Sequence, residues 1–376
     1  MKNTLDRSIK KADAAAYVIY DSSLNPDMRY MTGFKAGDSM LYIKHPDRRG
    51  TLIVPQMEKD RALSESKCDV LSRGDAGFFE FLKIETDPYT AQARMIAEIA
   101  GGNVLVPHNF PIILAKELEK FCEVRIDRGS IEEMRSVKSA DEISAVRRCQ
   151  KATDAAMEFA IEMIKNADSD NGELEINEVP LTSDYLKSEI ECFLLKRGFT
   201  AKDTIASCGY ETAMPHATGD GVILENEPVV IDIFPCEIKT GYHSDMTRTV
   251  VRGEPSSEIE DMYKCVYDAK MHAKSLIRSN VTGKFLYDAV MNFFEENGYM
   301  TETEGFIHSL GHGVGLAIHE SPSLSPSGKE LQSGNIIAVE PGLYYKKHGG
   351  VRLEDIGLVT DSGFDCFTQY KEELRI

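Results

Sequence analysis

The sequence predicts an α+β protein built from two domains, residues 1–130 and residues 131–376. Three observations lead to this expectation. The chain has 376 residues, which exceeds the usual length of a single domain. Its first 130 residues alternate between strand-like and helix-like stretches, a pattern typical of an α/β layer. The remaining residues open with helical patterns and end in strand signals.

The first domain is predicted from short apolar runs. Runs of strand length occupy residues 16–20, 40–45, 51–55, 104–107 and 122–126. The spacing of apolar residues predicts helices over residues 89–99 and 111–121. Because strands and helices alternate here, we expect helices packed against a sheet.

A polar stretch over residues 127–139 predicts the boundary between the domains. Ser139 and Glu142 have the spacing of a capping box, which satisfies free backbone N–H groups at the start of a helix. This helix is expected to continue to about residue 165. Residues 166–177 are acidic and polar and predict an exposed loop. Further helices are expected over residues 183–197 and 257–279.

Strand signals dominate from Pro228 onward and predict two hairpins. The first joins residues 229–233 and 247–252 through residues 235–241. The second joins residues 335–344 and 351–360 through residues 346–350. Because side chains alternate along a strand, Arg352 and Glu354 should share one face, opposite Val351 and Leu353. Each hairpin would bring two carboxylates to a common face, a repetition that suggests internal pseudo-symmetry.

Composition excludes several classes of function. Hydrophobic residues make up 42% of the chain, enough for a proper core, and the net charge is −18. A protein with this much negative charge repels phosphate backbones and anionic lipids. We therefore expect neither nucleic acid nor membrane as a partner. The eight cysteines include no Cys-x-x-Cys pair, and no apolar run is long enough to span a membrane. A reducing, cytoplasmic location is therefore expected.

Five potential metal ligands lie in the C-terminal half. Four carboxylates and one imidazole carry too much negative charge for one divalent ion, whereas two ions sharing carboxylates, about 3.5–4 Å apart, could activate a water. Taken alone, Asp232 could instead pair with Arg248 or cap a turn. Taken together, the carboxylates have few cations near them in sequence, chiefly Arg248 and Arg352, so the metal interpretation is favoured. The five ligands are Asp232, Asp245, His312, Glu340 and Glu354.

Three further histidines accompany these ligands. His319 follows His312 by seven residues and His216 precedes Asp232 by sixteen. Histidines that titrate near neutral pH suit proton transfer and the stabilisation of a tetrahedral intermediate. For His308, a structural role and a substrate contact are both open. The sequence contains no P-loop and no Gly-x-Ser-x-Gly motif.

Two other features have two interpretations each. The basic turn at residues 346–348 is either simply solvated or able to meet a substrate carboxylate. Cys236 is either a nucleophile or a small buried thiol, and the second is favoured because no base is evidently placed beside it.

These motifs resemble those of the pita-bread metallopeptidases, the group that contains methionine aminopeptidase, Xaa-Pro aminopeptidase and prolidase. Residues 25–34, Asn-Pro-Asp-Met-Arg-Tyr-Met-Thr-Gly-Phe, resemble a recurrent motif of the creatinase-like N-terminal domain. Residues 135–143 resemble the junction into the catalytic domain. The resemblance implies a creatinase-like α/β domain followed by a pita-bread catalytic domain, and it favours the Xaa-Pro branch.

The resemblance also implies roles for the site residues. The five ligands would bind two divalent ions (Mn²⁺, Co²⁺ or Zn²⁺), bridged by Asp245 and Glu354. His312 and Glu340 would complete one ion, and Glu340 would be the base for a hydroxide shared by the metals. His216 and His319 match family histidines that contact the substrate and stabilise the intermediate, and Arg352 matches a family arginine that supports the site or contacts the substrate. His308 is a further candidate substrate contact that the resemblance does not assign. Relatives are commonly homodimers, which is the assembly expected here.

Two departures from the family pattern bear on the substrate. The usual Asp-x-Gly at the first ligand is here Asp232-Ile233-Phe234-Pro235, and Ser323 stands where prolidases often carry an Arg for the carboxylate of a dipeptide. The sequence thus favours an aminopeptidase that removes the residue before proline from longer peptides. Prolidase is the alternative. A catalytically inactive binding module and a metal-free amidinohydrolase are disfavoured because all five ligands are retained.

Overall fold

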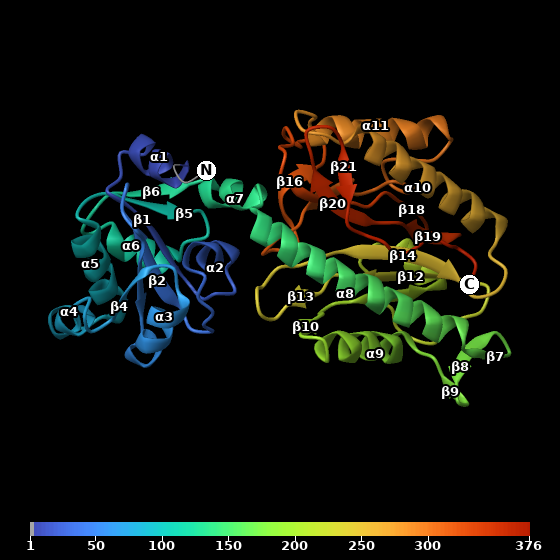
Figure 1. Cartoon of the computed structure of the whole chain (residues 1–376), viewed down its shortest axis with the longest axis horizontal. Helices are drawn as coiled ribbons and strands as arrows, with labels where there is room; N and C mark the ends of the chain where they lie inside the picture. Colours follow the sequence, from blue (N-terminus) through green and yellow to red (C-terminus); the bar gives the residue numbers. More distant parts are fainter. Residues whose placement is uncertain (1–3) are drawn as a thin grey trace. The chain divides into compact units, whose positions relative to one another are not determined.

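The computed structural model describes residues 4–376, so residues 1–3 of the first predicted domain lie outside the described residues. The chain divides into two compact units between Arg135 and Ser136 (Figure 1). The first unit has helices around a mixed sheet, and the second combines long helices with antiparallel strands. The predicted α+β class is confirmed.

The first unit is built on a six-stranded sheet in the order β4-β3-β2-β1-β5-β6. The pairs β1–β5, β5–β6 and β3–β4 are parallel, and the pairs β1–β2 and β2–β3 are antiparallel. The strands are β1 (Ala16–Asp21), β2 (Met40–Lys44), β3 (Thr51–Val54), β4 (Asp69–Ser72), β5 (Val104–Pro107) and β6 (Val124–Asp127). The helices are α1 (Thr4–Lys11), α2 (Pro26–Thr32), 3₁₀ helix η1 (Gln56–Glu58), α3 (Lys59–Glu65), α4 (Phe78–Glu85), α5 (Pro88–Ala100), α6 (Ile112–Leu118) and α7 (Ser130–Ser136).

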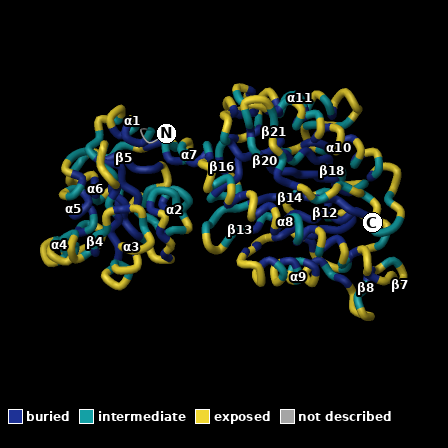
Figure 2. The backbone as a smooth tube through the Cα atoms, viewed as in Figure 1, coloured by how far each residue is buried: buried dark blue, intermediate teal, exposed yellow. Residues whose placement is uncertain are grey.

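Both faces of this sheet are covered. Along β1, Ala16 and Val18 pack into one hydrophobic cluster, and Tyr17 and Ile19 pack into another. All four side chains are buried, and Figure 2 shows the central strands in the buried colour. A strand that is buried on both faces has a continuous run of apolar residues. This run is the signal from which the sequence predicts β1.

The two largest hydrophobic clusters of the second unit are each formed by a pair of helices and a set of strands, and a smaller third cluster surrounds Val314. In the first, α8 (Ala140–Lys165) and α9 (Ser183–Leu195) cover a three-stranded antiparallel sheet in the order β11-β12-β14. These strands are β11 (Ile205–Cys208), β12 (Pro228–Ile233) and β14 (Met246–Val251). The predicted capping box opens α8, and the backbone N–H of Ser139 donates to Glu142 Oε2 at 2.7 Å.

In the second cluster, α10 (Ser257–Leu276) and α11 (Gly283–Glu296) cover the strands of the C-terminal third. A five-stranded sheet runs in the order β16-β15-β17-β20-β21, beside the pair β18–β19. The strands are β15 (Gly311–Gly313), β16 (Glu320–Leu324), β17 (Ile336–Val339), β18 (Gly342–Tyr345), β19 (Gly349–Arg352), β20 (Asp355–Val359) and β21 (Phe364–Cys366).

Several short elements differ from the sequence predictions. The boundary stretch contains helix α7, and the predicted exposed loop contains two strands of a small antiparallel sheet, whose side chains are mostly exposed. The predicted connection of the first hairpin contains a strand that pairs with residues 199–200. The short elements are β7 (Asp168–Asp170), β8 (Glu173–Ile176), β9 (Val179–Pro180), β10 (Phe199–Thr200), β13 (Cys236–Glu237) and the 3₁₀ helix η2 (Gly209–Ala213).

The second predicted hairpin forms, but its ladder is interrupted. Val339 pairs with Asp355 at the end of one ladder, and Gly342 pairs with Arg352 at the start of the other. Pro341 lies between them and has no N–H to donate, which explains the break. Glu340 and Glu354 therefore stand where the strands separate.

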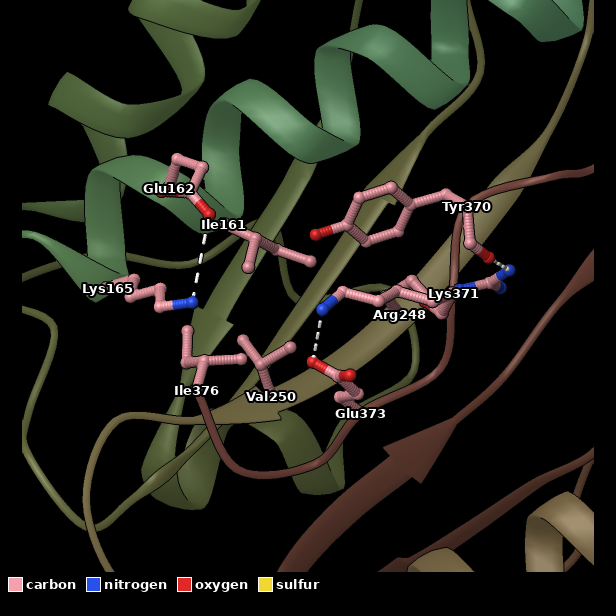
Figure 3. A pocket seen from close by; sticks show the side chains of 9 residues that line it. All are labelled: Ile161, Glu162, Lys165, Arg248, Val250, Tyr370, Lys371, Glu373 and Ile376. Atoms are coloured by element: carbon pink, nitrogen blue, oxygen red, sulfur yellow. Dashed lines mark hydrogen bonds and ion pairs between the residues drawn. The ribbon is translucent and has the colours of Figure 1, made fainter.

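Arg248 on β14 holds the C-terminal segment through hydrogen bonds (Figure 3). The Arg248 guanidinium donates to the carbonyl oxygens of Tyr370 at 2.9 Å and Glu354 at 2.6 Å, and it pairs with Asp355 at 3.0 Å. Its side chain is only 2% exposed. One buried cation thus connects the chain end to the backbone of a predicted metal ligand.

Arg248→Met is expected to lower the free energy of unfolding by roughly 3 kcal/mol, because it leaves buried acceptors and Asp355 without this partner. Urea denaturation measures the loss. Arg147→Met is the matched control, since Arg147 pairs with Asp365 while 44% exposed, and such pairs contribute about 0–1 kcal/mol. Equal losses in the two variants would contradict the assignment of Arg248 as the buried anchor.

Among the described residues, no helix is both long and apolar enough to cross a membrane.

Candidate active site

A cavity of about 560 Å³ opens in the second unit, within the size range of small-molecule sites. Its lining brings together every residue that the sequence analysis placed at the site. These are His216, Asp232, Asp245, His308, His312, His319, Glu340, Arg352 and Glu354, and Ser323 lines it as well. The common face expected from the two hairpins is thus the wall of one cavity.

The first hairpin contributes the two aspartates. Asp232 lies in β12 opposite Thr247, and Asp245 directly precedes β14. The alternative prediction, that Asp232 pairs with Arg248, is wrong. Asp232 Oδ2 instead accepts a hydrogen bond from Arg352 Nη2 at 2.8 Å. Arg248 is bound to the C-terminal segment on the other side of the strand pair.

The second hairpin contributes the two glutamates at its interruption. Glu354 Oε2 accepts from the Thr247 hydroxyl at 2.9 Å, which ties the two hairpins together. Val351 and Leu353 point into the hydrophobic cluster, whereas Arg352 and Glu354 line the cavity. The predicted alternation therefore holds across the break in the ladder.

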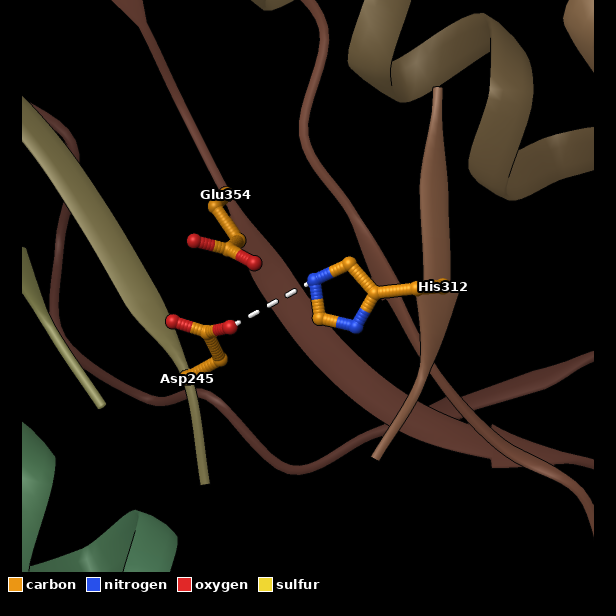
Figure 4. A group of neighbouring side chains, drawn as sticks. All are labelled: Asp245, His312 and Glu354. Carbon is orange, nitrogen blue, oxygen red and sulfur yellow. Dashed lines mark ion pairs between the residues drawn. The ribbon is translucent and has the colours of Figure 1, made fainter. Parts of the chain in front are cut away.

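His312 approaches the carboxylates from β15. Its Nδ1 lies 3.1 Å from the Gly313 carbonyl oxygen, so that Nε2 is turned toward the acids. Nε2 lies 3.6 Å from Asp245 Oδ2 and 3.5 Å from Glu340 Oε1. Ligand atoms of Asp245, His312 and Glu354 all lie within 4.8 Å of one another (Figure 4). This spacing would suit a shared metal ion.

A neighbouring glycine allows this approach. A Cβ on Gly311 would lie 2.0 Å from the Ala338 carbonyl oxygen on the adjacent strand. Only glycine permits so close a backbone contact at this position of β15.

The buried carboxylates need a cation. Asp232 Oδ1, Asp245 Oδ1 and Glu354 Oε1 are buried, and within residues 4–376 none has a hydrogen-bond partner. Burial, and then the neighbouring carboxylates, raises the pKa of Asp245 and of Glu354 well above the usual range. An unpaired buried charge is costly, and metal coordination is one of the few ways to offset it. The donor set therefore fits divalent metal ions.

The other histidines lie around the carboxylates with different partners. His308 is held by Tyr344, whose hydroxyl lies 2.9 Å from its Nε2, and burial lowers its pKa. The His319 ring stands edge-on to His312 at 4.3 Å, and burial lowers its pKa too. His216 follows Pro215, whose carbonyl oxygen accepts from Arg352.

Arg352 forms more hydrogen bonds at the cavity than the sequence predicted. Besides Asp232, its guanidinium donates to the Tyr344 hydroxyl at 3.0 Å and to the Thr247 hydroxyl at 3.2 Å. Tyr344 and Thr247 were not predicted at the site. Thr247 lies two residues after Asp245, and that spacing could have indicated the shared strand face.

Two sequence alternatives are not supported. The basic turn at residues 346–348 joins β18 to β19 and does not line the cavity. Cys236 lies on β13 outside the lining, and its thiol donates to the Glu237 carbonyl oxygen, so it has no place as a nucleophile in this cavity.

In metal-stripped protein, Asp245 and Glu354 are expected to contribute more stability as the pH is lowered from their raised folded-state pKa values toward the ordinary range of carboxyl groups. The pKa values of Asp245 and Glu354 are raised in the folded state. Such groups contribute stability below their unfolded pKa, and this contribution is lost as the pH rises through the folded pKa. Each extra bound proton changes stability by about 1.4 kcal/mol per pH unit. Thermal unfolding across this range measures the slope, which Asp245→Asn should reduce. A flat profile in the unchanged protein would contradict the expectation.

Comparison with known proteins finds relatives over both units of the chain. Residues 144–361 match the metallopeptidase family M24, and residues 2–137 match the creatinase/prolidase N-terminal domain. A protein of Pyrococcus horikoshii named Xaa-Pro dipeptidase is 32% identical over 93% of this chain and 92% of its own length. A protein of Pyrococcus furiosus with the same name is 32% identical over 89% of this chain and 88% of its own length.

Solved structures are similar over the whole chain. The prolidase from Pyrococcus horikoshii has a TM-score of 0.83 and 28% identity, and covers 99% of both chains. An Xaa-Pro dipeptidase from Bacillus anthracis has a TM-score of 0.85 over 100% of this chain and 98% of its own, at 24% identity, which shows the fold alone.

The two-unit fold and the cavity of convergent carboxylates and histidines define a metal-dependent hydrolase. The chain belongs to the metallopeptidase family M24 and carries that family's creatinase/prolidase N-terminal domain. The resemblance found in the sequence, including the creatinase-like and pita-bread domains that it implied, is confirmed. Family membership implies metal ions, for which Asp245, His312 and Glu354 form a possible site.

Proposed function

We propose that this metallopeptidase uses two divalent ions to hydrolyse the bond between the N-terminal residue of a peptide and a proline in second position. The observation that carries the proposal is the set of three buried carboxylate oxygens without partners, next to Nε2 of His312. These atoms come from three separate segments of the chain. Their convergence has a simple explanation if cations hold them together.

Each ligand would contribute from a fixed backbone position. Asp245, His312 and Glu354, whose ligand atoms lie within 4.8 Å of one another, would hold the ions together with Asp232 and Glu340. Divalent ions such as Mn²⁺, Co²⁺ or Zn²⁺, when bound, supply Lewis acidity that activates water and polarises a carbonyl. Arg352 holds Asp232 through Oδ2, which leaves Oδ1 directed at the site.

Side chains of the cavity would transfer the protons of the attacking water and the leaving amine. Burial raises the pKa of the Glu340 carboxyl, so it could take a proton from water and return it to the leaving amine near neutral pH. Burial lowers the pKa of His319, and its neutral imidazole could donate to the carbonyl oxygen as charge develops there. His216 and His308 line the same cavity and would contact the substrate.

The cavity offers little to a free dipeptide carboxylate. Among the described residues, Arg352 is the only Lys or Arg side chain in the lining, and it is already bound to Asp232. Ser323 adds only a hydroxyl, which lies 2.5 Å from that of Ser325. This arrangement supports peptides longer than two residues. Prolidase is the second candidate, supported by the two relatives named Xaa-Pro dipeptidase at 32% identity.

Three peptides separate these functions after metal reconstitution: Ala-Pro, Ala-Pro-Ala and Ala-Ala-Ala. Aminopeptidase activity predicts that Ala-Pro-Ala has the highest kcat/KM and that Ala-Ala-Ala is cleaved much more slowly. Cleavage of Ala-Pro alone would establish prolidase instead. Metal binding without cleavage of any proline peptide would overturn the proposal in favour of an inactive binding module.

A further inference from the structure

A fully buried ion pair lies next to His319, one of the residues that line the cavity. Lys138 Nζ and Glu320 Oε1 are 2.7 Å apart, and their side chains are 1% and 2% exposed. A buried pair is often no more stabilising than apolar residues of the same size, because both charges lose their hydration. Its placement therefore calls for an explanation beyond stability.

Glu320 closes the loop that carries His319. This loop, residues 314–319, connects β15 to β16, and Glu320 pairs with Gly313 where the strand register shifts. Glu320 Oε2 accepts from the backbone N–H of Ala317 at 3.3 Å. A Cβ on Gly315 would lie 2.3 Å from Glu320 Oε1, so the carboxylate fills the space inside the loop.

Besides Glu320, this loop is held by backbone hydrogen bonds and by Val314, which is buried in a hydrophobic cluster. No helix or strand includes residues 314–319, and their backbone bonds to the rest of the unit include His243 N–H to Gly315 O at 2.8 Å and Val314 N–H to Ile336 O at 3.0 Å. His319 is the next residue before Glu320, and its ring reaches His312 at 4.3 Å. The position of the imidazole thus depends on how Glu320 is held.

Lys138 holds Glu320 from a rigid frame. Its backbone N–H donates to the Gly334 carbonyl oxygen at 2.9 Å, and Val137 forms a bridge with Asn335. Its Nζ also donates to the Ser136 carbonyl oxygen at 3.2 Å. Asn335 directly precedes β17, the strand that leads to Glu340. The ammonium group therefore connects the His319 loop to the strand that positions Glu340.

We propose that Lys138 is a positioning residue for His319 and acts through Glu320, an inference that rests on the proposed peptidase function. The pair sets the distance between the imidazole and the Glu340 carboxylate, the two groups assigned to the carbonyl oxygen and the protons. Loss of the pair would displace the imidazole without removing a metal ligand.

The decisive protein is the double variant Lys138→Met/Glu320→Gln, which removes both charges of this buried pair together. Its kcat on the best proline peptide is expected to fall roughly 100-fold, the cost of a displacement of about 1 Å. Its KM should stay within roughly threefold and its metal content should equal that of the unchanged protein. Each single variant should lose kcat as well and also melt at a lower temperature, because the buried charge that remains loses its partner in this ion pair.

A test of coupling shows whether the effect passes through His319. Adding Lys138→Met/Glu320→Gln to His319→Ala should lower kcat little further, since the three residues would act as one unit. Lys44→Met is the matched control. Lys44 pairs with Asp6 at 2.6 Å in the first unit, 14% and 10% exposed, so its loss should lower the melting temperature and leave kcat unchanged.

The outcomes separate the two proposals. If the unchanged, metal-loaded protein cleaves no proline peptide, the proposed function fails and this inference falls with it. If that protein is active and the folded double variant has a normal kcat, the inference alone is overturned. Additive losses in the His319→Ala background would also overturn it, because Lys138 would then act by another route.

Discussion

Glu340→Gln is expected to lower kcat by about three orders of magnitude at saturating metal, because the group that takes and returns the proton is lost. Glutamine keeps the size of the side chain and an oxygen that can face the cavity, but it cannot accept the proton. The structure places Glu340 Oε1 3.5 Å from His312 Nε2, at the break between two strand ladders where its backbone is fixed. Steady-state kinetics on a proline peptide measure the effect.

The control for this substitution is Glu302→Gln, which removes an exposed carboxylate of the same unit. It should leave both kcat and KM unchanged. If Glu340→Gln retains more than a tenth of the activity while its metal content is normal, Glu340 is not the proton-transfer group.

Removal of divalent metal is expected to abolish activity, with a loss of at least about a thousandfold, because no other group in the cavity could activate water equally well. Mn²⁺, Co²⁺ or Zn²⁺ added back to the stripped protein should restore turnover. The buried oxygens Asp232 Oδ1, Asp245 Oδ1 and Glu354 Oε1 have no hydrogen-bond partner among the described residues, which suits them as metal ligands. Activity and metal content, measured on the same samples during titration, test this expectation.

The matched variant for the metal experiment is Asp245→Asn/Glu354→Gln, which removes both proposed bridging carboxylates with little change in volume. Titration with the same ions should restore little activity to it. Full activity of the unchanged protein after exhaustive chelation would contradict a metal-dependent mechanism.

Much of the fold could be predicted from the sequence because its elements have strong local signals. The continuous apolar run at β1 and the capping box at Ser139 each specify an element without reference to the rest of the chain. Helix α11 was missed, although Thr282 caps it by accepting from the N–H of Phe285. The β7–β8 hairpin was missed because its strands are short and mostly exposed and have no apolar periodicity.

The sequence could indicate which residues line the cavity, but not how their side chains are connected. Ligand types in a fixed order identify the carboxylates, since four acids beside buried runs need a cation. The pairing of Asp232 with Arg352 could not be predicted from a local pattern, because the two residues lie 120 positions apart in the sequence. The same holds for Lys138 and Glu320, 182 positions apart. Such contacts depend on how the hairpins pack together, which no local pattern records.

The dinuclear centre is tested most directly by anomalous X-ray scattering from crystals of the Mn²⁺-loaded protein. Two peaks are expected about 3.5–4 Å apart. The carboxylates of Asp245 and Glu354 should lie between them, and His312 Nε2 should coordinate one of the two ions. Peaks elsewhere, or fully occupied crystals with no peak among these carboxylates, would contradict the site.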